Sequence, residues 1–472
     1  MRTQSEDFPG WYQDVVREAQ LAEPGLARGT MVIRPYGFAI WEAIQRAVDD
    51  RIKATGHENL YFPLFIPYRL LEKEAEHVEG FAPEVAVVTH AGGEKLEEPL
   101  AVRPTSETII WDTYSRWIQS YRDLPLLYNQ WANVVRWEMR PRVFLRTTEF
   151  LWQEGHTAHE TEAEARAETL LALQQIYLDA VTSVMAMPVH IGRKSPAERF
   201  AGAVETYTLE ALMRDRKALQ AGTSHYLGQN FAKAYGVQFQ NREGQLEYAY
   251  ATSWGMSTRT VGGVIMTHGD DKGLRLPPAL APVQVAIVPI FRTDEERTRV
   301  LEESNRLASA LGAYRVKVDD REDLRPGFKF NHWELRGVPV RIEIGPRDLD
   351  GGQVTLVPRL TGEKTQVPLG DVPRHVATAL DETQSGLYEQ AKAFRDEHTF
   401  RPGDMAEMVK LLEDPGGFML AGWCGSEECE AKVKAETKAT IRFLPLEPTP
   451  PGGKCIVCGK EAVDEAAWAQ AY

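Results

Sequence analysis

The stretch RWEMRPRVFLRTTEFLWQEGH, residues 136–156, predicts two hydrophobic strands joined by a loop that carries Arg140, Pro141 and Arg142. An Arg-x-Glu triplet opens it, so the strand would hold a guanidinium in a fixed position. Such a guanidinium can bridge a carboxylate and a phosphate through paired hydrogen bonds and counter negative charge that develops on the phosphate. Arg136 is therefore a candidate catalytic residue. A β-hairpin with surface arginines is the alternative interpretation.

A second phosphate-binding arginine is expected later in the chain. Residues 253–259 have the sequence SWGMSTR and precede the small, apolar run 261–266. Because glycine lets a backbone approach a nucleotide closely, Arg259 at the end of this stretch is the candidate. The alternative is a glycine-tolerant turn into a buried helix.

The bulk composition limits the possible functions. The chain has 472 residues, a formal net charge of −14 and four cysteines. Its length predicts about three domains. Nucleic-acid binding depends on neutralising phosphates, so an acidic chain must gather its basic residues on one face to bind RNA. No apolar run approaches the ~20 residues of a membrane span. Residues 1–10 are polar and lack a secretory signal, so we expect a cytoplasmic protein without membrane contact.

Hydrophobic periodicity predicts helices over residues 36–52 and 160–185, and strands over 59–66, 85–89 and 124–131. Gly56 is a natural stop for the first helix. Pro63 would break the strand over 59–66 and confine it to a sheet edge or to a special contact. Between His159 and Gly222 the sequence leaves room only for the long helix, a short strand and a second helix.

Two boundaries are expected to divide the chain into residues 1–281, 282–400 and 401–472. The first follows Pro277 and Pro278, which cannot continue a helix. Beyond it, strands over residues 283–290, 314–318, 338–344 and 354–357 alternate with a helix over 294–311. Such alternation predicts a small α/β domain with a largely parallel sheet.

The cysteines of the third segment fall into two close pairs, Cys424 with Cys429 and Cys455 with Cys458. This C-x4-C and C-x2-C spacing suits tetrahedral zinc, and adjacent glycines allow tight turns. Four thiolates leave no open coordination position, so the predicted site is structural. Unrelated buried thiols are the alternative.

A further block, RPTSET, covers residues 103–108 ahead of an amphipathic helix. One interpretation is a helix start with Thr105 or Ser106 as the N-cap residue. The other is that Thr105 and Glu107 face a cationic amine, because a hydroxyl and a carboxylate suit an ammonium group. Trp152 and His156 would then supply an aromatic wall and a hydrogen bond.

Four blocks together resemble prolyl-tRNA synthetases of the archaeal and eukaryotic-like type: RPTSET (103–108), EFLWQEGH (149–156), GTSHYLGQNF (222–231, expected to form a polar turn) and TSWGMSTR (252–259). The resemblance covers essentially the whole chain. It implies an α+β fold with a class II synthetase antiparallel-sheet catalytic domain, an α/β anticodon-binding domain and a small α/β C-terminal zinc domain. It also implies that residues 36–63 form a dimer-interface motif.

The same resemblance implies site residues and partners. Arg136 and Arg259 would be catalytic. The proline site would consist of Thr105, Glu107, Arg136, Trp152, His156 and His225. The ATP site would consist of Arg136, Glu138, Arg146, Thr147, Phe150, Gln220, Thr223 and Arg259. Cys424, Cys429, Cys455 and Cys458 would bind structural Zn²⁺. The implied partners are ATP with Mg²⁺, L-proline, tRNA(Pro) and a second subunit of a homodimer.

The resemblance has further consequences in the last two segments. Basic and aromatic residues of the second domain would read anticodon bases: Arg325, Phe328, Lys329, Phe330, Arg341 and Arg347, with Glu343. The last residue of the sequence, Tyr472, would reach toward the active site.

Two other functions stay open at this stage. One is a related class II enzyme of different specificity, such as a threonyl-type synthetase. The other is a non-catalytic synthetase-like protein that binds RNA or regulates, although such a protein has no need for both arginines. For a proline enzyme, a small pocket separates substrates by only ~1–3 kcal/mol per methylene, so we expect activation of alanine and cysteine. The short segment between His159 and Gly222 cannot hold a large editing insertion.

Overall fold

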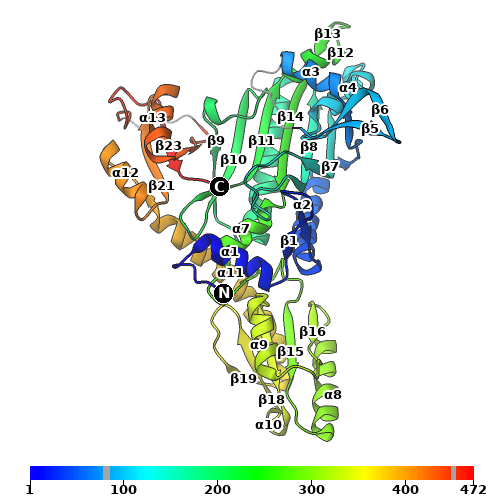
Figure 1. Cartoon of the computed structure of the whole chain (residues 1–472), viewed down its shortest axis with the longest axis vertical. Helices are drawn as coiled ribbons and strands as arrows, with labels where there is room; N and C mark the ends of the chain where they lie inside the picture. The colour runs from blue at the N-terminus through cyan, green and yellow to red at the C-terminus, as the bar shows by residue number, and fades with distance from the viewer. Residues whose placement is uncertain (78–84, 448–452) are drawn as a thin grey trace.

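The computed structural model describes residues 1–77, 85–447 and 453–472, and its largest element is a seven-stranded sheet within the first 281 residues (Figure 1). Its strands lie in the order β3 (Glu58–Asn59), β7 (Leu126–Val135), β8 (Glu149–His159), β14 (Tyr250–Ser257), β11 (Ala218–Gly228), β10 (Glu205–Leu212) and β9 (Val189–Arg193). Every neighbouring pair is antiparallel except β3 with β7. The antiparallel catalytic sheet expected from the sequence is therefore present.

The stretch that opened the sequence analysis forms the β7–β8 hairpin. The two strands pair from Leu126 with Ala158 to Val135 with Glu149. Arg136 continues the ladder, since its N–H donates to the carbonyl of Thr148 at 2.8 Å. The predicted strand–loop–strand arrangement is confirmed.

Two long helices cover the sheet where the sequence predicts them. Helix α2 (Pro35–Ala54) begins with proline in its first turn and ends just before Gly56, which adopts φ +88°. Helix α5 (Glu162–Leu171) starts with a capping box at Thr161 and continues through two π-helical segments, η2 (Ala172–Leu178) and η3 (Ala180–Val184). The buried side chains of these helices pack in one apolar core with Trp254.

The second helix predicted between His159 and Gly222 is wrong. Residues Glu205–Leu212 form strand β10, which lies between β9 and β11 and is buried at every position after the first. A strand buried on both faces has no alternating pattern, so its sequence resembles a buried helix. Its threonine and tyrosine residues favour the strand. Residues 160–221, all described, contain no further domain.

The break predicted at Pro63 in the strand over residues 59–66 is confirmed, and the two pieces belong to different sheets. Glu58–Asn59 form β3 of the large sheet, whereas β4 (Phe65–Pro67) belongs to a separate sheet with β6 (Glu94–Val102) and β5 (Val87–Ala91). Pro63 lies between the two strands and has no N–H for a ladder. The strand predicted over 85–89 corresponds to β5.

Residues 283–371 lie in the lower lobe of the molecule, drawn in yellow-green in Figure 1. Its five-stranded sheet has the order β16 (Val316–Val318), β15 (Val285–Pro289), β17 (Val340–Ile344), β18 (Gln353–Pro358) and β19 (Thr365–Pro368). Only the pairs that β15 makes are parallel, so the prediction of a largely parallel sheet is half wrong. Residues 345–352, between β17 and β18, are too few for a parallel crossover.

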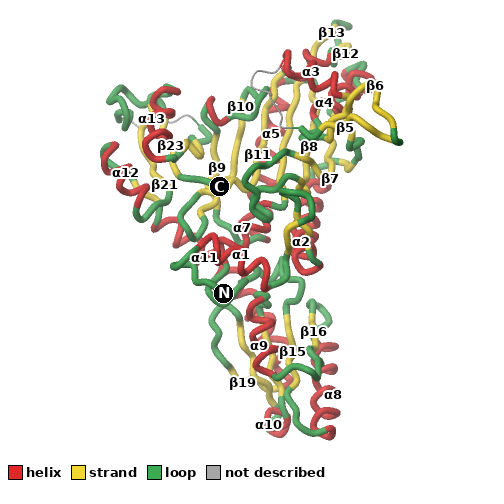
Figure 2. The backbone as a smooth tube through the Cα atoms, in the orientation of Figure 1, coloured by secondary structure: helices red, strands yellow, loops and turns green. Residues whose placement is uncertain are grey.

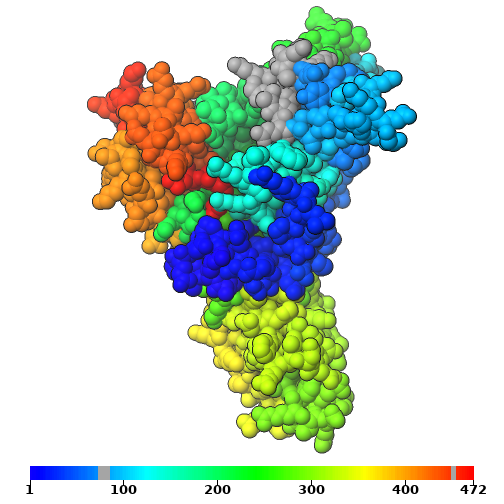
Figure 3. Space-filling view, in the orientation of Figure 1, coloured from blue at the N-terminus to red at the C-terminus, as the bar shows by residue number. Residues whose placement is uncertain are grey.

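Helices α8 (Asp294–Ala310), α9 (Pro326–Leu335), α10 (Pro346–Asp350) and α11 (Val372–Glu397) accompany this sheet. Figure 2 shows α11, the longest of them, running from the lower lobe toward the C-terminal part. The N-terminal segment, dark blue in Figure 3, lies between the catalytic part and the lower lobe. Tyr36 Oη donates to the carbonyl of Arg336 at 3.1 Å across this junction.

The C-terminal part has a four-stranded sheet of order β20 (Thr399–Phe400), β21 (Phe418–Trp423), β23 (Asp464–Ala469) and β22 (Thr440–Phe443), with helices α12 (Met405–Glu413) and α13 (Glu427–Thr437). It is joined to the catalytic sheet at the outer strand. Arg193 and Leu444 exchange two backbone hydrogen bonds of 2.9 and 2.7 Å. Strand β9 is therefore not a free sheet edge.

The remaining described elements are α1 (Phe8–Glu18), β1 (Ala22–Pro24), β2 (Met31–Ile33), α3 (Tyr68–His77), α4 (Glu107–Trp117), η1 (Tyr121–Asp123), η4 (Pro196–Glu198), α6 (Asn230–Tyr235), β12 (Gln238–Gln240), β13 (Leu246–Tyr248), α7 (Arg259–His268) and η5 (Leu369–Asp371). Within the described part of the chain, no helix has the length and apolar character needed to cross a membrane.

Candidate active site

A polar cavity of about 240 Å³ opens beside the seven-stranded sheet. Strand β8 presents alternate residues to it, Phe150, Trp152, Glu154 and His156, as the two-residue period of a strand requires. Ten of the residues predicted from the sequence line the cavity: Thr105, Glu107, Arg136, Phe150, Trp152, His156, Gln220, Thr223, His225 and Arg259. Folding therefore brings all four sequence blocks to one site.

Glu107, Glu154 and His156 form an anionic group in this cavity. All three are buried, and their polar atoms lie within 4.8 Å of one another. His156 Nε2 lies 2.9 Å from Glu154 Oε2. Burial disfavours charge on both groups, but their mutual contact outweighs it, so the pKa of His156 is raised and that of Glu154 is lowered. Two carboxyl groups beside one imidazole offer several acceptor oxygens, which suit an ammonium group.

Ser106 bears on both interpretations of the RPTSET block. It occupies the N-cap position of α4, but its side chain makes no capping hydrogen bond. Its hydroxyl instead donates to Glu154, and the neighbouring Thr105 hydroxyl donates to Glu107. The block therefore starts the helix and also orders the carboxylates of the cavity.

The cationic part of the cavity contains Arg136 and Arg259. The Arg136 guanidinium lies over the rings of Trp152 and Phe150, 5.2 and 5.6 Å from their centroids, and its Nε donates to the carbonyl of Pro104 at 2.9 Å. Burial lowers the pKa of both arginines, to about 10 for Arg259, where Arg136 adds repulsion. Both guanidinium groups still carry charge at neutral pH and can bind carboxylate or phosphate oxygens.

His225 is neutral at neutral pH because burial, with repulsion from His156 and Arg136, lowers its pKa to about 3. Its Nδ1 lies 3.0 Å from the Thr206 hydroxyl, and its ring packs against Phe200 at 4.6 Å between centroids. The polar turn predicted over residues 222–231 is wrong, since most of it is strand β11. Thr223 and His225 of this stretch line the cavity, as predicted, although the secondary structure around them was predicted wrongly.

Three predicted ATP residues, Glu138, Arg146 and Thr147, are not among those that line the cavity. They belong to the adjacent β7–β8 loop, where Arg146 Nε pairs with Glu138 Oε2 at 2.8 Å. Thr147 borders a second, less polar cavity of about 620 Å³ between this loop and the N-terminal segment. Tyr472 lines that second cavity too, and its hydroxyl donates to Asp215 at 2.6 Å.

Several cavity residues were missed. Glu154 lies inside the quoted block EFLWQEGH, and its two-residue spacing from Trp152 and His156 was the available signal. Lys194, Glu198, Arg199 and Phe200 also line the cavity. They follow β9 in a segment whose fold was misjudged, so no local pattern indicated them.

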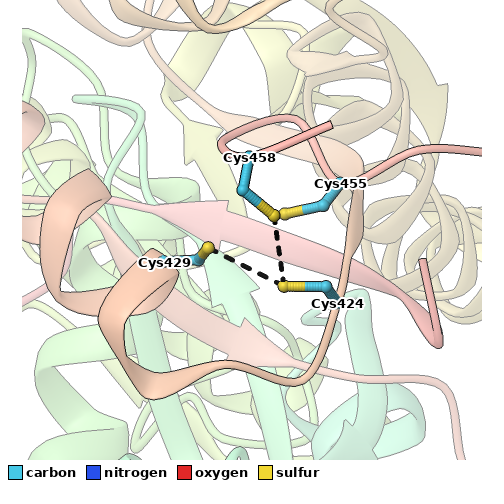
Figure 4. Close-up of side chains that lie close together, drawn as sticks. All are labelled: Cys424, Cys429, Cys455 and Cys458. Carbon is cyan, nitrogen blue, oxygen red and sulfur yellow. Dashed lines mark hydrogen bonds between the residues drawn. The ribbon is translucent and has the colours of Figure 1, made fainter. Parts of the chain in front are cut away.

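The four cysteine sulfurs come together as the spacing predicted (Figure 4). Cys424 Sγ lies 3.7 Å from Cys429 Sγ and 3.6 Å from Cys458 Sγ. Zn–S bonds of ~2.3 Å in a tetrahedron place sulfurs about 3.8 Å apart, so the cluster fits zinc. Gly425 and Gly459 adopt φ +82° and +73°, which allows the predicted tight turns beside the ligands.

Comparison with known families divides the chain into three matched regions. Residues 89–268 match the class II tRNA synthetase core domain (G, H, P, S and T). Residues 284–378 match an anticodon binding domain, and residues 405–472 match the C-terminal domain of prolyl-tRNA synthetase. These regions contain, respectively, six of the seven strands of the large sheet (all but β3), the five-stranded sheet and the cysteine cluster.

Individual relatives align over nearly the full length. A proline–tRNA ligase of Symbiobacterium thermophilum is 55% identical over 478 residues, covering 99% of this chain and 97% of the relative. Proline–tRNA ligases of Chloroflexus aggregans and Alkaliphilus oremlandii are each 54% identical, covering 99% of this chain and 98% and 96% of the relatives.

Proposed function

This chain belongs to the proline–tRNA ligase family of class II aminoacyl-tRNA synthetases, and on that premise we propose that it activates L-proline with ATP to prolyl-adenylate and transfers the prolyl group to tRNA(Pro). The observation that carries the proposal is the placement of Glu107, Arg136 and Arg259 on one cavity. A carboxylate suits the amine of an amino acid, and two guanidinium groups suit its carboxylate and the phosphates of ATP.

The proline site lies at the anionic group. Glu107 and the Thr105 hydroxyl receive the secondary ammonium, whose two N–H donors match two acceptors. Trp152 packs against the ring, His156 offers its Nδ1, which is buried without a hydrogen-bond partner, and neutral His225 adds no competing charge. Arg136 lies close enough to bind the carboxylate of the same molecule.

ATP, which enters with Mg²⁺, occupies the cationic part of the cavity. In the first step an oxygen of the proline carboxylate attacks the α-phosphorus, and pyrophosphate leaves. Arg136 bridges the two reactants and counters the charge that grows on the phosphate oxygens, while Arg259 binds the leaving group. Both arginines are therefore the proposed catalytic residues.

The remaining nucleotide contacts come from the sheet and the β7–β8 loop. Phe150 stacks under the adenine ring. The Arg136 guanidinium lies 5.6 Å from the centroid of the Phe150 ring and partly covers this position. Gln220 and Thr223 border the sugar. Glu138 receives the adenine amino group, with Arg146 and Thr147 beside it. For this contact the nucleotide must bind at the edge of the Glu138–Arg146 ion pair.

ATP–pyrophosphate exchange measured with each amino acid in turn tests the function. We expect exchange with proline at rates far above those with threonine, and weak but detectable exchange with alanine and cysteine, because the pocket distinguishes them mainly by size. Exchange led by threonine would support a threonyl-type enzyme. No exchange with any amino acid would favour a non-catalytic RNA-binding protein and end the proposal.

Structural zinc is the proposed occupant of Cys424, Cys429, Cys455 and Cys458. The sulfur separations support it, as does the absence of an open ligand position among four thiolates. Bound metal would contribute directly to the stability of the C-terminal domain. Chelation should therefore lower the melting temperature and release about one zinc per chain, as measured by elemental analysis. An unchanged melting temperature after full zinc loss would contradict the structural role.

A homodimer built on residues 36–63 is the proposed assembly. Aromatic side chains are exposed at this motif and beside it: Tyr61 is 69%, Phe65 46% and Trp117 47% exposed. Exposed apolar groups gathered in this way mark interaction surfaces. Tyr61→Glu should convert the dimer to a monomer in analytical ultracentrifugation, whereas a monomeric wild-type protein would exclude this assembly.

The division into a catalytic domain (1–281), an anticodon-binding domain (282–400) and a zinc domain (401–472) is part of the same proposal, as are the archaeal and eukaryotic-like type and a cytoplasmic location. In the second domain Phe328 is 66% exposed and available for stacking on a base. Lys329 is buried and donates to the carbonyl of Asp319 at 2.9 Å, so Phe328 is the stronger candidate for anticodon contact.

A further inference from the structure

A second group of buried charges lies behind the cavity wall, and the proposed mechanism does not use it. Glu210 on β10 is fully buried between two cations. Its carboxylate lies 2.8 Å from Lys194 Nζ and 3.1 Å from the guanidinium of Arg442, and it accepts a hydrogen bond of 2.9 Å from Thr208. Lys194 lines the cavity, whereas Arg442 lies on β22 of the C-terminal part.

The segment that carries Lys194 is attached to the C-terminal part on both sides of the lysine. Arg193 pairs with Leu444 through two backbone hydrogen bonds. The Ser195 hydroxyl donates to Glu430 Oε1 at 2.8 Å, and Glu430 follows the zinc-site residue Cys429 in α13. The C-terminal part therefore fixes the backbone at Lys194 as well as the carboxylate that holds its ammonium group.

Lys194 keeps hydrogen-bonding capacity for a ligand. Its ammonium group has three N–H donors, and among the described residues it makes one hydrogen bond, to Glu210. Arg442 has a second carboxylate nearby, since its Nη1 lies 3.9 Å from Glu198 Oε2. Because Lys194 lines the cavity, an anionic or polar group bound there is the available partner for its remaining donors.

The strand register shows which part of the cavity Lys194 serves. Its N–H donates to the carbonyl of Thr206, which pairs with His225, and its Nζ reaches Glu210, which pairs with Gln220. His225 belongs to the proposed proline site and Gln220 to the proposed ATP site. The side chain of Lys194 therefore runs along the wall between the amino acid and the nucleotide.

We propose that Lys194 binds the sugar–phosphate part of a substrate nucleotide and that Arg442, acting through Glu210, positions it. The inference rests on the proposed function, which supplies two sources of this chemistry: ATP and the acceptor end of tRNA. Lys194 is then a substrate-binding residue, and Arg442 is a positioning residue contributed by the zinc-bearing part of the chain.

The test uses Lys194→Met, Arg442→Met and the double variant in the full-length protein. Either single change leaves Glu210 with one cation, and the double variant also carries Glu210→Gln, so none of the three leaves an unpaired buried carboxylate. Lys432→Met is the matched control, because it removes one exposed positive charge from α13, where the ion pair of Lys432 within the described residues is with Glu436, at 4.0 Å. Proline-dependent pyrophosphate exchange reports on ATP, and single-turnover transfer from preformed prolyl-adenylate reports on tRNA. Melting temperature and zinc content monitor the fold.

Loss of one charge-assisted hydrogen bond predicts that Lys194→Met lowers kcat/KM about 10- to 100-fold in one of the two assays. A loss in exchange identifies ATP as the ligand, and a loss in transfer alone identifies tRNA. Arg442→Met should show a smaller loss in the same assay, and the double variant should be no worse than Lys194→Met. Lys432→Met should match wild type.

Two results would overturn the inference. Lys194→Met could match wild type in both assays, or the losses of the single variants could multiply in the double variant, which would show that Arg442 does not act through Lys194. If Arg442→Met lacks zinc or melts early, Arg442→Lys decides the question by the same comparison, since it keeps the charge and loses the planar fork. Wild-type protein without proline-dependent exchange defeats the proposed function instead, so the two failures are distinguishable.

Discussion

The seven-stranded sheet and the five-stranded sheet differ in how they treat charge. Strands β8 and β10 of the first sheet bury Glu154, His156 and Glu210 in or behind the cavity. The second sheet packs an apolar core of valine, isoleucine and leucine, and its inner strand β15 is buried at all five positions. Its charged groups, such as Arg341 paired with Glu343 at 2.9 Å, have each other as partners.

This difference shows where each domain keeps its function. Buried carboxylates and guanidinium groups cost stability unless they are paired, and they are retained where chemistry requires them. In the proposed function, the face of the catalytic sheet is the reacting surface. The second sheet serves as a scaffold there, so we expect the recognition residues of its domain to be exposed, as Phe328 of α9 is.

Removing the central cation of the first sheet should have the largest effect. Arg136→Met should lower kcat for proline-dependent pyrophosphate exchange by about 10²- to 10³-fold, because a preorganised group that stabilises transition-state charge is lost. Arg116→Met, which removes an exposed arginine paired with Asp112 on α4, is the control and should retain wild-type exchange. An Arg136→Met enzyme within a factor of three of wild type would contradict the catalytic role.

A substitution that creates a cavity in the core of the second sheet should lower stability and leave adenylate formation unchanged. Ile342 lies on β17 in the apolar core, and 0% of its surface is accessible to solvent. Ile342→Ala should cost about 2–5 kcal/mol in the unfolding free energy of this domain. Chemical denaturation measures that cost, and tRNA-independent exchange under native conditions should stay unchanged. An equal loss of exchange would show that the two sheets are not independent.

The smallest predicted effect concerns a buried histidine of the catalytic part. Burial lowers the pKa of His268 to about 3, and its Nε2 lies 2.9 Å from the carbonyl of Met185. The unfolded chain, with an ordinary histidine pKa of ~6.5, binds a proton that the folded chain rejects. Stability should therefore fall as pH decreases below ~6.5, by up to about 1.4 kcal/mol per pH unit.

Urea unfolding between pH 5 and 7.5 measures this slope. His268→Gln should reduce the slope by close to one proton, because glutamine does not titrate. The exposed His90→Gln variant is the control and should keep the wild-type slope. Parallel curves for His268→Gln and wild type would show that His268 does not set the pH dependence.

The sequence predicted those features that local pattern fixes. The β7–β8 hairpin, helix α2 and the alternation of residues 283–318 follow from hydrophobic periodicity with glycine or proline at the ends. The cysteine spacing predicted a cluster that the structure confirms. Strand β10 was mistaken for a helix because burial on both faces removes the alternation that marks a strand. The direction of β18 was mistaken because it depends on the length of its connection to β17.

The residues of the site divide in the same way. Arg136, Arg259 and Glu107 stand in blocks whose composition already suggests phosphate and amine chemistry, so the sequence by itself determined them as candidates. Lys194, Glu210 and Arg442 stand in no such block, and Arg442 lies 232 positions from Glu210 along the chain. Only the tertiary structure brought these three residues together, because the partner of a buried charge is set by the strand register and by the packing of the domains. Local hydrophobic periodicity carries no information about the register or the packing.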